Sequence, residues 1–162
     1  MTDSPLTIRD SSAWDESQIR HYLDACRHPL RVAIDARDGP LIVPLWFCFR
    51  DGAFYCASRP DAFVVEAIRQ SDRCGFDLSD NTVPYRGVRG QGKAAIVPDE
   101  GPATLRMLVA RYLGNLDSEF ARWLLSRSED EVAIVIRPEW ITAWDFGKRM
   151  QGLTTDRQPL TK

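Results

Sequence analysis

Ser58, Arg59 and Pro60 stand where an apolar run passes into a helix-like segment, so they are the first residues to consider for chemistry. The backbone N–H groups at a helix N-terminus and the aligned helix dipole favour a phosphate group. A hydroxyl and a guanidinium beside them would add hydrogen bonds, with Arg31 and Arg89 near in a closed barrel. The three residues therefore indicate a phosphate site, while a capping serine beside a solvated arginine explains them equally well.

Other patterns exclude most catalytic chemistries that need no cofactor. His21, Cys26 and His28 do not have the spacing of metal ligands, so no metal site is predicted. With two histidines and no G-x-S-x-G motif, a nucleophilic triad is not indicated. The glycines between Gly87 and Gly92 lead into a strand rather than a helix, unlike those of a nucleotide-binding loop. If the protein is an enzyme, a cofactor therefore carries the chemistry.

Composition favours one globular domain without nucleic-acid or membrane partners. The 162 residues carry a net charge of −2, so no strong basic field attracts nucleic acid or an anionic membrane. All but three of the 21 basic residues are arginine, which suits carboxylate or phosphate ligands, although a genomic bias would give the same composition. No segment is long and apolar enough to span a membrane, and the N-terminus lacks a signal-peptide pattern.

Three apolar runs joined by two Asp-Gly pairs predict two antiparallel hairpins. The runs are 30–35, 41–49 and 53–58, and the turns are Asp38-Gly39 and Asp51-Gly52, whose residues tolerate positive φ. The middle run does not alternate apolar and polar residues, so we expect both of its faces to be covered. A small antiparallel sheet achieves this by closing into a barrel and packing its outside against helices or a second subunit.

The second turn also bears on the redox state of the cysteines. A two-residue loop at Asp51-Gly52 would place Cys48 opposite Tyr55, and Cys56 opposite Phe47. Neighbouring strand positions point to opposite faces, so Cys48 and Cys56 could not form a disulfide. Because the chain has no C-x-x-C pair either, we expect reduced thiols and a cytoplasmic protein.

The rest of the chain predicts helices and strands around these hairpins. Ser12 to Asp15 resembles a capping box and predicts a helix through Asp24 or Cys26. Proline at a first-turn position predicts a helix over 61–69, and Pro102 with Gly114 bounds another. The remaining predicted elements are strands over 73–78, 85–97, 131–137 and 140–146 and a helix over 118–126. The predicted organisation is an N-terminal tail and helix (1–27), a barrel domain (28–150) and a flexible tail (151–162).

The order of these elements resembles the pyridoxamine 5′-phosphate oxidase-like proteins, the FMN-binding split β-barrel family. The resemblance runs from His28 to Met150 and rests on five segments: His28–Ala33, Val43–Phe47, Phe54–Ser58, Tyr85–Ala94 and Trp144–Met150. It implies a mainly β (α+β) fold with peripheral helices, an antiparallel Greek-key split barrel of six to seven strands. It also implies a homodimer with two flavin sites at the subunit interface, each built from both chains.

The resemblance further assigns cofactor-binding roles by position. Arg31, Val32 and Ala33 would contact the flavin edge, and Ser58 and Arg59 would face the phosphate. The residues that would lie near the cofactor or across the interface are Arg89, Gln91 and Trp144.

The chain departs from the family pattern after the third strand. Many members place a Lys or Arg one turn into the following helix, whereas residues 62–66 here contain Glu66 and no basic residue. Losing such a contact costs about 1.5–3 kcal/mol, or roughly ten- to hundredfold in affinity. Arg59 or Arg69 could substitute; otherwise the cofactor is weakly bound, is a deazaflavin, or is absent.

Three functional hypotheses follow from the resemblance. The first is an FMN-dependent oxidoreductase that moves a hydride to or from a small molecule. The second is a deazaflavin-dependent reductase. The third is a non-catalytic split barrel that binds flavin or haem. No motif identifies the substrate or a catalytic residue.

Overall fold

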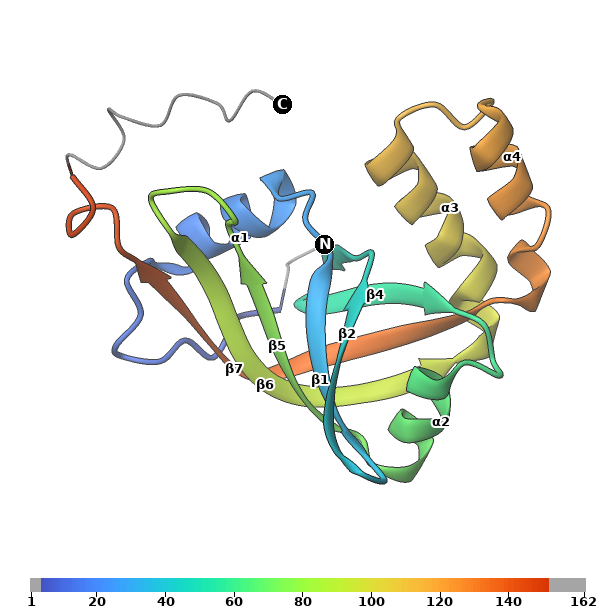
Figure 1. Cartoon of the computed structure of the whole chain (residues 1–162), viewed down its shortest axis with the longest axis horizontal. Helices are drawn as coiled ribbons and strands as arrows, with labels where there is room; N and C mark the ends of the chain where they lie inside the picture. The colour runs from blue at the N-terminus through green and yellow to red at the C-terminus, as the bar shows by residue number, and fades with distance from the viewer. Residues whose placement is uncertain (1–3, 152–162) are drawn as a thin grey trace, which may run out of the picture.

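The computed structural model describes residues 4–151, and its central feature is one antiparallel sheet of seven strands in the order β2-β1-β5-β6-β7-β4-β3 (Figure 1). The strands are β1 (Leu30–Ala36), β2 (Gly39–Leu45), β3 (Cys48–Arg50), β4 (Ala53–Ser58), β5 (Arg73–Ser79), β6 (Arg86–Val97) and β7 (Val132–Asp145). The helices are α1 (Glu16–Ala25), α2 (Phe63–Gln70), α3 (Gly101–Leu113) and α4 (Glu119–Leu125), with 3-10 turns at Pro98–Glu100 and Ser128–Asp130. The mainly β fold with peripheral helices is thus confirmed. Apart from Gln151, the predicted C-terminal tail lies outside the described residues.

The apolar run 41–49 is not one strand, which corrects the prediction. It completes β2, crosses over at Trp46 and Phe47, and continues as β3. Because β2 and β3 lie at the two ends of the strand order, this crossover brings the sheet edges together into a split barrel. The run is also not covered on both faces within one chain, since Leu41 is 42% and Ile42 64% exposed. Only a segment outside the described residues, or a second molecule, could bury the exposed side chains of Leu41 and Ile42.

Both predicted hairpins form, although their turns differ in detail. Asp51 and Gly52 both have positive φ, +51° and +73°, and form the two-residue loop that pairs Arg50 with Ala53. In the first hairpin the register pairs Ala36 with Gly39, so the loop consists of residues 37–38. Gly39 is the first residue of β2 and carries the positive φ of +124°. The register of the second hairpin places Cys48 opposite Tyr55, and all four cysteines are free, as expected.

The main hydrophobic core fills the barrel, and helices close it. Side chains of alternate strand positions, such as Leu30, Phe54 and Ile134, are fully buried inside. α1 and α2 add Ile19 and Val65 to this core from opposite ends of the barrel (Figure 1). α3 and α4 form a separate hairpin that packs outside the barrel against β4. No helix among residues 4–151 is long and apolar enough to cross a membrane.

Two helices begin later than predicted. The capping box of α1 is formed by Asp15 and Gln18, whose side chains each accept a hydrogen bond from the other's backbone N–H. The hydroxyl of Ser12 instead accepts from the N–H of Ala143 on β7. α2 begins at Phe63, because the Ala62 N–H first closes a turn onto the carbonyl of Arg59. Ser58 and Arg59 therefore do not directly precede a helix N-terminus.

β7 is one long strand rather than two. The predicted break is a bulge, since Gln91 pairs with Trp140 while Gly92 pairs with Pro138. Beyond the bulge, residues 7–13 cover the free edge of β7, where the Arg9 N–H donates to the carbonyl of Ile141 at 3.0 Å. The N-terminal segment is therefore part of the barrel wall.

Candidate functional site

A row of five cross-strand neighbours forms the floor and walls of a groove on the outer face of the sheet. Ala33 lies opposite both Ile42 and Gly75, and Gln91 lies opposite both Gly75 and Trp140. Side chains at these positions point away from the core, because their strand neighbours are buried. We call this cavity the outer groove; it has a volume of about 390 Å³ and is lined by Arg31, Ala33, Ile42, Arg89, Gln91 and Trp140 among others.

The floor of the outer groove is almost free of side chains. A Cβ placed on Gly75 would lie 3.7 Å from the Cβ of Ala33 and 3.8 Å from the carbonyl oxygen of Gly90, which are ordinary contacts. The neighbouring glycines differ, because a Cβ on Gly90 or Gly92 would overlap a β7 carbonyl oxygen. Gly90 and Gly92 thus allow close strand packing, whereas Gly75 leaves open space. A flat floor with an aliphatic and an aromatic wall suits a planar ring.

The next row across the sheet is charged. Arg31 lies opposite Asp77, and Asp77 opposite Arg89. Nη1 of Arg31 is 3.4 Å from Oδ2 of Asp77, whose two oxygens also accept from the hydroxyl of Ser79 at 2.6 and 2.7 Å. Arg89 is paired through its backbone with β5 and β7, but its side chain makes no hydrogen bond or ion pair with any described residue. This end of the groove therefore has one unneutralised guanidinium, which favours an anionic group.

Trp140 forms a wall of the groove and is held from two sides. Its Nε1 donates to Oε1 of Gln91 at 3.3 Å, and the guanidinium of Arg9 lies 4.4 Å from the ring centroid. Sequence reasoning missed both Trp140 and Arg9. The sequence predicts Trp140 to lie in a strand, but only the bulge in β7 determines that it faces Gln91. No motif in the polar N-terminal segment indicates that Arg9 contacts the groove.

The structure brings together four of the eight predicted cofactor-binding residues. Arg31, Ala33, Arg89 and Gln91 all line the outer groove. The side chain of Val32 does not, because it is fully buried inside the barrel. A contact from Val32 to a ligand in the groove is therefore limited to its backbone.

Trp144 lies opposite Gly87, beyond the charged row, and its ring packs against Phe146 with the centroids 5.1 Å apart. It therefore lies outside the residues that line the outer groove.

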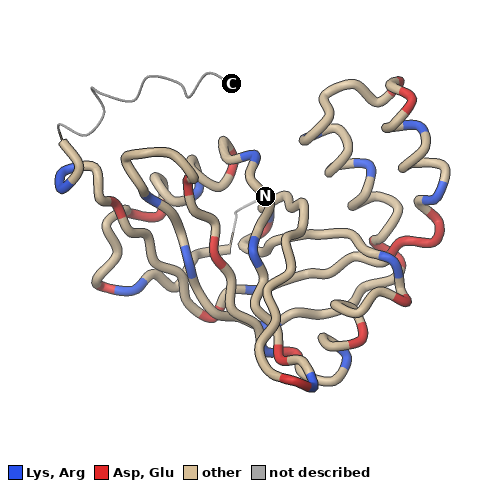
Figure 2. The backbone as a smooth tube through the Cα atoms, in the orientation of Figure 1, with Lys and Arg blue, Asp and Glu red and all other residues tan. Residues whose placement is uncertain are grey.

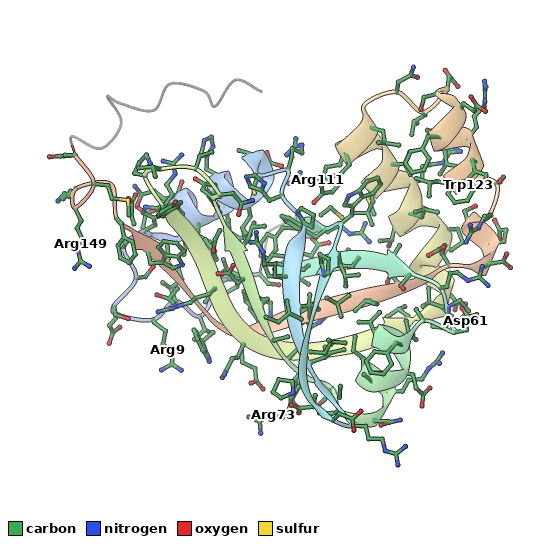
Figure 3. The ribbon with its side chains drawn as sticks, in the orientation of Figure 1. Arg9, Asp61, Arg73, Arg111, Trp123 and Arg149 are labelled. Carbon is green, nitrogen blue, oxygen red and sulfur yellow. The ribbon has the colours of Figure 1, made fainter. Side chains whose placement is uncertain are left out.

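Ser58 and Arg59 lie apart from the groove. Ser58 pairs with Val132 at the start of β7, whereas the groove lies beside Trp140 on the same strand. In Figure 3, Asp61 next to this end and Arg9 beside the groove lie on opposite sides of the molecule. The two sets of predicted residues could meet at one ligand only if two chains contributed.

The surroundings of Arg59 are acidic. Its Nε lies 3.1 Å from Oδ1 of Asp61, and this partner, with weaker effects of Asp130 and Glu131, raises the pKa of Arg59. A hollow of about 540 Å³ beside Pro60 is lined by acidic residues including residues 129–131, a continuous red stretch after α4 in Figure 2. Burial raises the pKa of Glu131 in this hollow. Because Arg59 is already paired with Asp61 and several carboxylates surround it, this end fits a phosphate less well than the charged row of the groove.

No family model and no curated protein sequence matches this chain, whereas solved structures do. A conserved hypothetical protein from Mycobacterium tuberculosis is similar over 96% of this chain and 98% of its own, with a TM-score of 0.73 and 21% identity. An F420 reductase is similar over 75% of this chain and 94% of its own (TM-score 0.60, 24% identity). A pyridoxamine 5′-phosphate oxidase-like protein from Listeria innocua is similar over 82% of this chain and 98% of its own (TM-score 0.60, 16% identity). The chain therefore has the split-barrel fold that the resemblance predicted.

Proposed function

We propose that the outer groove binds a flavin or deazaflavin and that the protein is an oxidoreductase acting on a small molecule. The observation that carries this proposal is the open floor at Gly75 beside the unneutralised Arg89. A tricyclic ring would lie on Ala33 and Gly75 between the walls formed by Ile42 and Trp140. An anionic group attached to the ring would reach the charged row.

The residues of the groove bind and orient rather than react. Arg31 and Arg89 would hold the anionic group, and the amide of Gln91 would contact the ring edge. A bound flavin or deazaflavin supplies hydride chemistry that no side chain here provides. FMN is the first candidate. The likeness to an F420 reductase supports a deazaflavin as the alternative.

We also propose that a second copy of the chain completes the site. In one chain the groove is open, and its wall residue Ile42 is 64% exposed. An exposed aliphatic wall beside a ligand groove is typical of an interface. A partner chain could also bring its own Arg59 to the groove, which would unite the two separated sets of predicted residues. This arrangement would exclude water from the bound ring.

Comparing FMN with riboflavin tests the location of the site, because the two ligands differ only in the phosphate. Arg89→Gln should weaken FMN binding by about 1.5–3 kcal/mol and leave riboflavin binding nearly unchanged. Arg106→Gln, at an exposed position on α3, is the matched control. Fluorescence titration of both ligands gives the dissociation constants.

The outcomes of this titration are distinct. If Arg89→Gln leaves FMN binding unchanged, the phosphate does not contact the charged row and its assignment to Arg89 is wrong. If Arg59→Gln also weakens FMN selectively, the phosphate is held by Ser58 and Arg59 instead. If the wild-type protein binds none of the three ligands FMN, riboflavin and a deazaflavin, the proposed function is wrong.

A further inference from the structure

We propose that Trp140, supported by Arg9, is a positioning residue that orients the side-chain amide of Gln91, so that this amide presents only N–H donors to the outer groove. The ligand of the groove would then carry an acceptor-rich edge, such as the carbonyl edge of a flavin-type ring. The identity of that ligand rests on the function proposed above. The orientation of Gln91 does not, because it follows from contacts within the chain.

The orientation follows from the chemistry of the indole group. An indole Nε1–H is a donor only, so the atom of Gln91 that meets it has to be the amide oxygen. The Nε1 to Oε1 distance of 3.3 Å agrees with this pairing. Gln91 and Trp140 are also direct cross-strand partners, which keeps their side chains adjacent on the outer face. With its oxygen engaged, Gln91 offers the NH₂ group to a ligand.

Trp140 in turn is fixed by the N-terminal segment. The guanidinium of Arg9 lies 4.4 Å from the indole centroid. The Ile141 N–H donates to the carbonyl of Thr7 at 2.9 Å, and the Arg9 N–H donates to that of Ile141 at 3.0 Å. A cation over the ring withdraws electron density from the indole and strengthens its N–H as a donor. Arg9 therefore both restricts the ring and favours its bond to Gln91.

The two guanidinium groups of the groove add further donors. Arg31 and Arg89 are donors only. The Asp77 carboxylate is an acceptor, but it is engaged within the chain: the Ser79 hydroxyl shares its one hydrogen between the two carboxylate oxygens, and Arg31 donates to one of them. A ligand that needs acceptors, such as an ammonium compound, would leave these donors unpaired. Ligands with carbonyl or phosphate oxygens would satisfy them.

Two substitutions at Gln91 separate the hydrogen bond to Trp140 from the donors offered to the ligand. Gln91→Glu keeps an acceptor for the indole but loses the NH₂ donors. Gln91→Lys keeps N–H donors but loses the acceptor. The ligand-free readout is the indole N–H resonance of Trp140, which is assigned by its disappearance in Trp140→Phe. It should shift upfield in Gln91→Lys, persist in Gln91→Glu, and shift upfield in Arg9→Gln but not in the control Arg106→Gln.

Riboflavin titration provides the second readout, because this ligand tests the ring edge without a phosphate. Trp140→Phe should weaken riboflavin about three- to tenfold, since the Gln91 amide is then free to turn over, and Gln91→Glu about ten- to hundredfold. In the Gln91→Lys background, adding Trp140→Phe should have no further effect on riboflavin affinity, because no amide remains for Trp140 to orient. Trp123→Phe, on the exposed face of α4, is the matched control.

Each outcome decides the proposal. An unmoved indole resonance in Gln91→Lys overturns the positioning of Gln91. Wild-type riboflavin affinity in Gln91→Glu overturns the role of the donors, while leaving the proposed function intact. If the wild-type protein binds no flavin, the proposed function fails, and the indole resonances alone decide whether Trp140 positions Gln91.

Discussion

Gly75 allows the stability of the fold to be separated from binding in the outer groove. The change is Gly75→Ala, which adds one methyl group to the floor. The new Cβ would lie 3.7 Å from the Cβ of Ala33 and 3.8 Å from the carbonyl oxygen of Gly90, so it meets ordinary van der Waals contacts. Gly75 also lacks the positive φ that would strain an alanine. The fold should therefore accept this substitution.

Gly75→Ala should raise the stability of the fold but lower the affinity for riboflavin. Replacing a glycine at a compatible backbone position stabilises a protein by about 0.4–1 kcal/mol, because the unfolded chain loses conformational freedom. In a chain of this size that corresponds to a rise in Tm of roughly 1–4 °C. The same methyl group occupies the place of a ring lying on the floor. Riboflavin binding should therefore weaken by about 1.4 kcal/mol or more, which is tenfold.

Urea unfolding and riboflavin fluorescence titration measure the two effects on one preparation. Gly92→Ala is the contrasting variant, because its Cβ would overlap the carbonyl oxygen of Arg137. Gly92→Ala should destabilise by about 1–3 kcal/mol, the usual cost of overpacking. If Gly75→Ala lowers stability as Gly92→Ala does, the floor is not open. If Gly75→Ala binds riboflavin as tightly as wild type, the ring does not lie on Gly75.

Three further predictions concern the turn, the acidic hollow and the assembly. Gly52→Val should destabilise by about 1–3 kcal/mol, because Gly52 has φ of +73° and a Cβ there would lie 3.2 Å from that of Ser4; an unchanged urea midpoint would contradict this. Burial raises the pKa of Glu131 in the folded protein, so the fold is more stable when this carboxyl is protonated. That added stability is lost as the pH rises through the folded-state pKa. Glu131→Gln should accordingly raise the Tm near pH 7 and give no gain below about pH 4, where the wild-type carboxyl is protonated. Light scattering should give about twice 18.4 kDa, and a wild-type monomer would remove the shared-site proposal. Ile42→Lys should shift the protein to the monomer, whereas Phe120→Lys, at an apolar position on α4 that is 53% exposed, should not.

Features governed by neighbouring residues could be predicted from the sequence. The Asp51-Gly52 loop forms because both residues tolerate positive φ, whatever surrounds them. α3 ends at Gly114, which has φ of +70°. The long strand β6 was also predicted within one residue of its bounds. In each case the controlling interaction lies within a few positions along the chain.

Other elements departed from prediction because distant contacts decided them. The run 41–49 reads as one apolar strand, but Trp46 and Phe47 cross between the two sheet edges, which only closure of the barrel requires. The pair Pro138-Glu139 predicts a turn between two strands, but β6 pairs with β7 on both sides of it, so the pair forms a bulge within one strand. Pro60 reads as a helix start, but a turn onto Arg59 precedes α2.

The candidate site shows the same division. The residue types that mark an anionic ligand, Arg31 and Arg89, are visible in the sequence, and the family resemblance added Ala33 and Gln91. Their meeting in one groove depends on the register of β1, β5, β6 and β7, because a shift by one residue would turn a strand's side chains to the other face. Trp140 faces Gln91 only because the bulge adds one residue to β7. Local sequence therefore determined the strands and the chemistry available on them, whereas the tertiary register decided which of those side chains share a site.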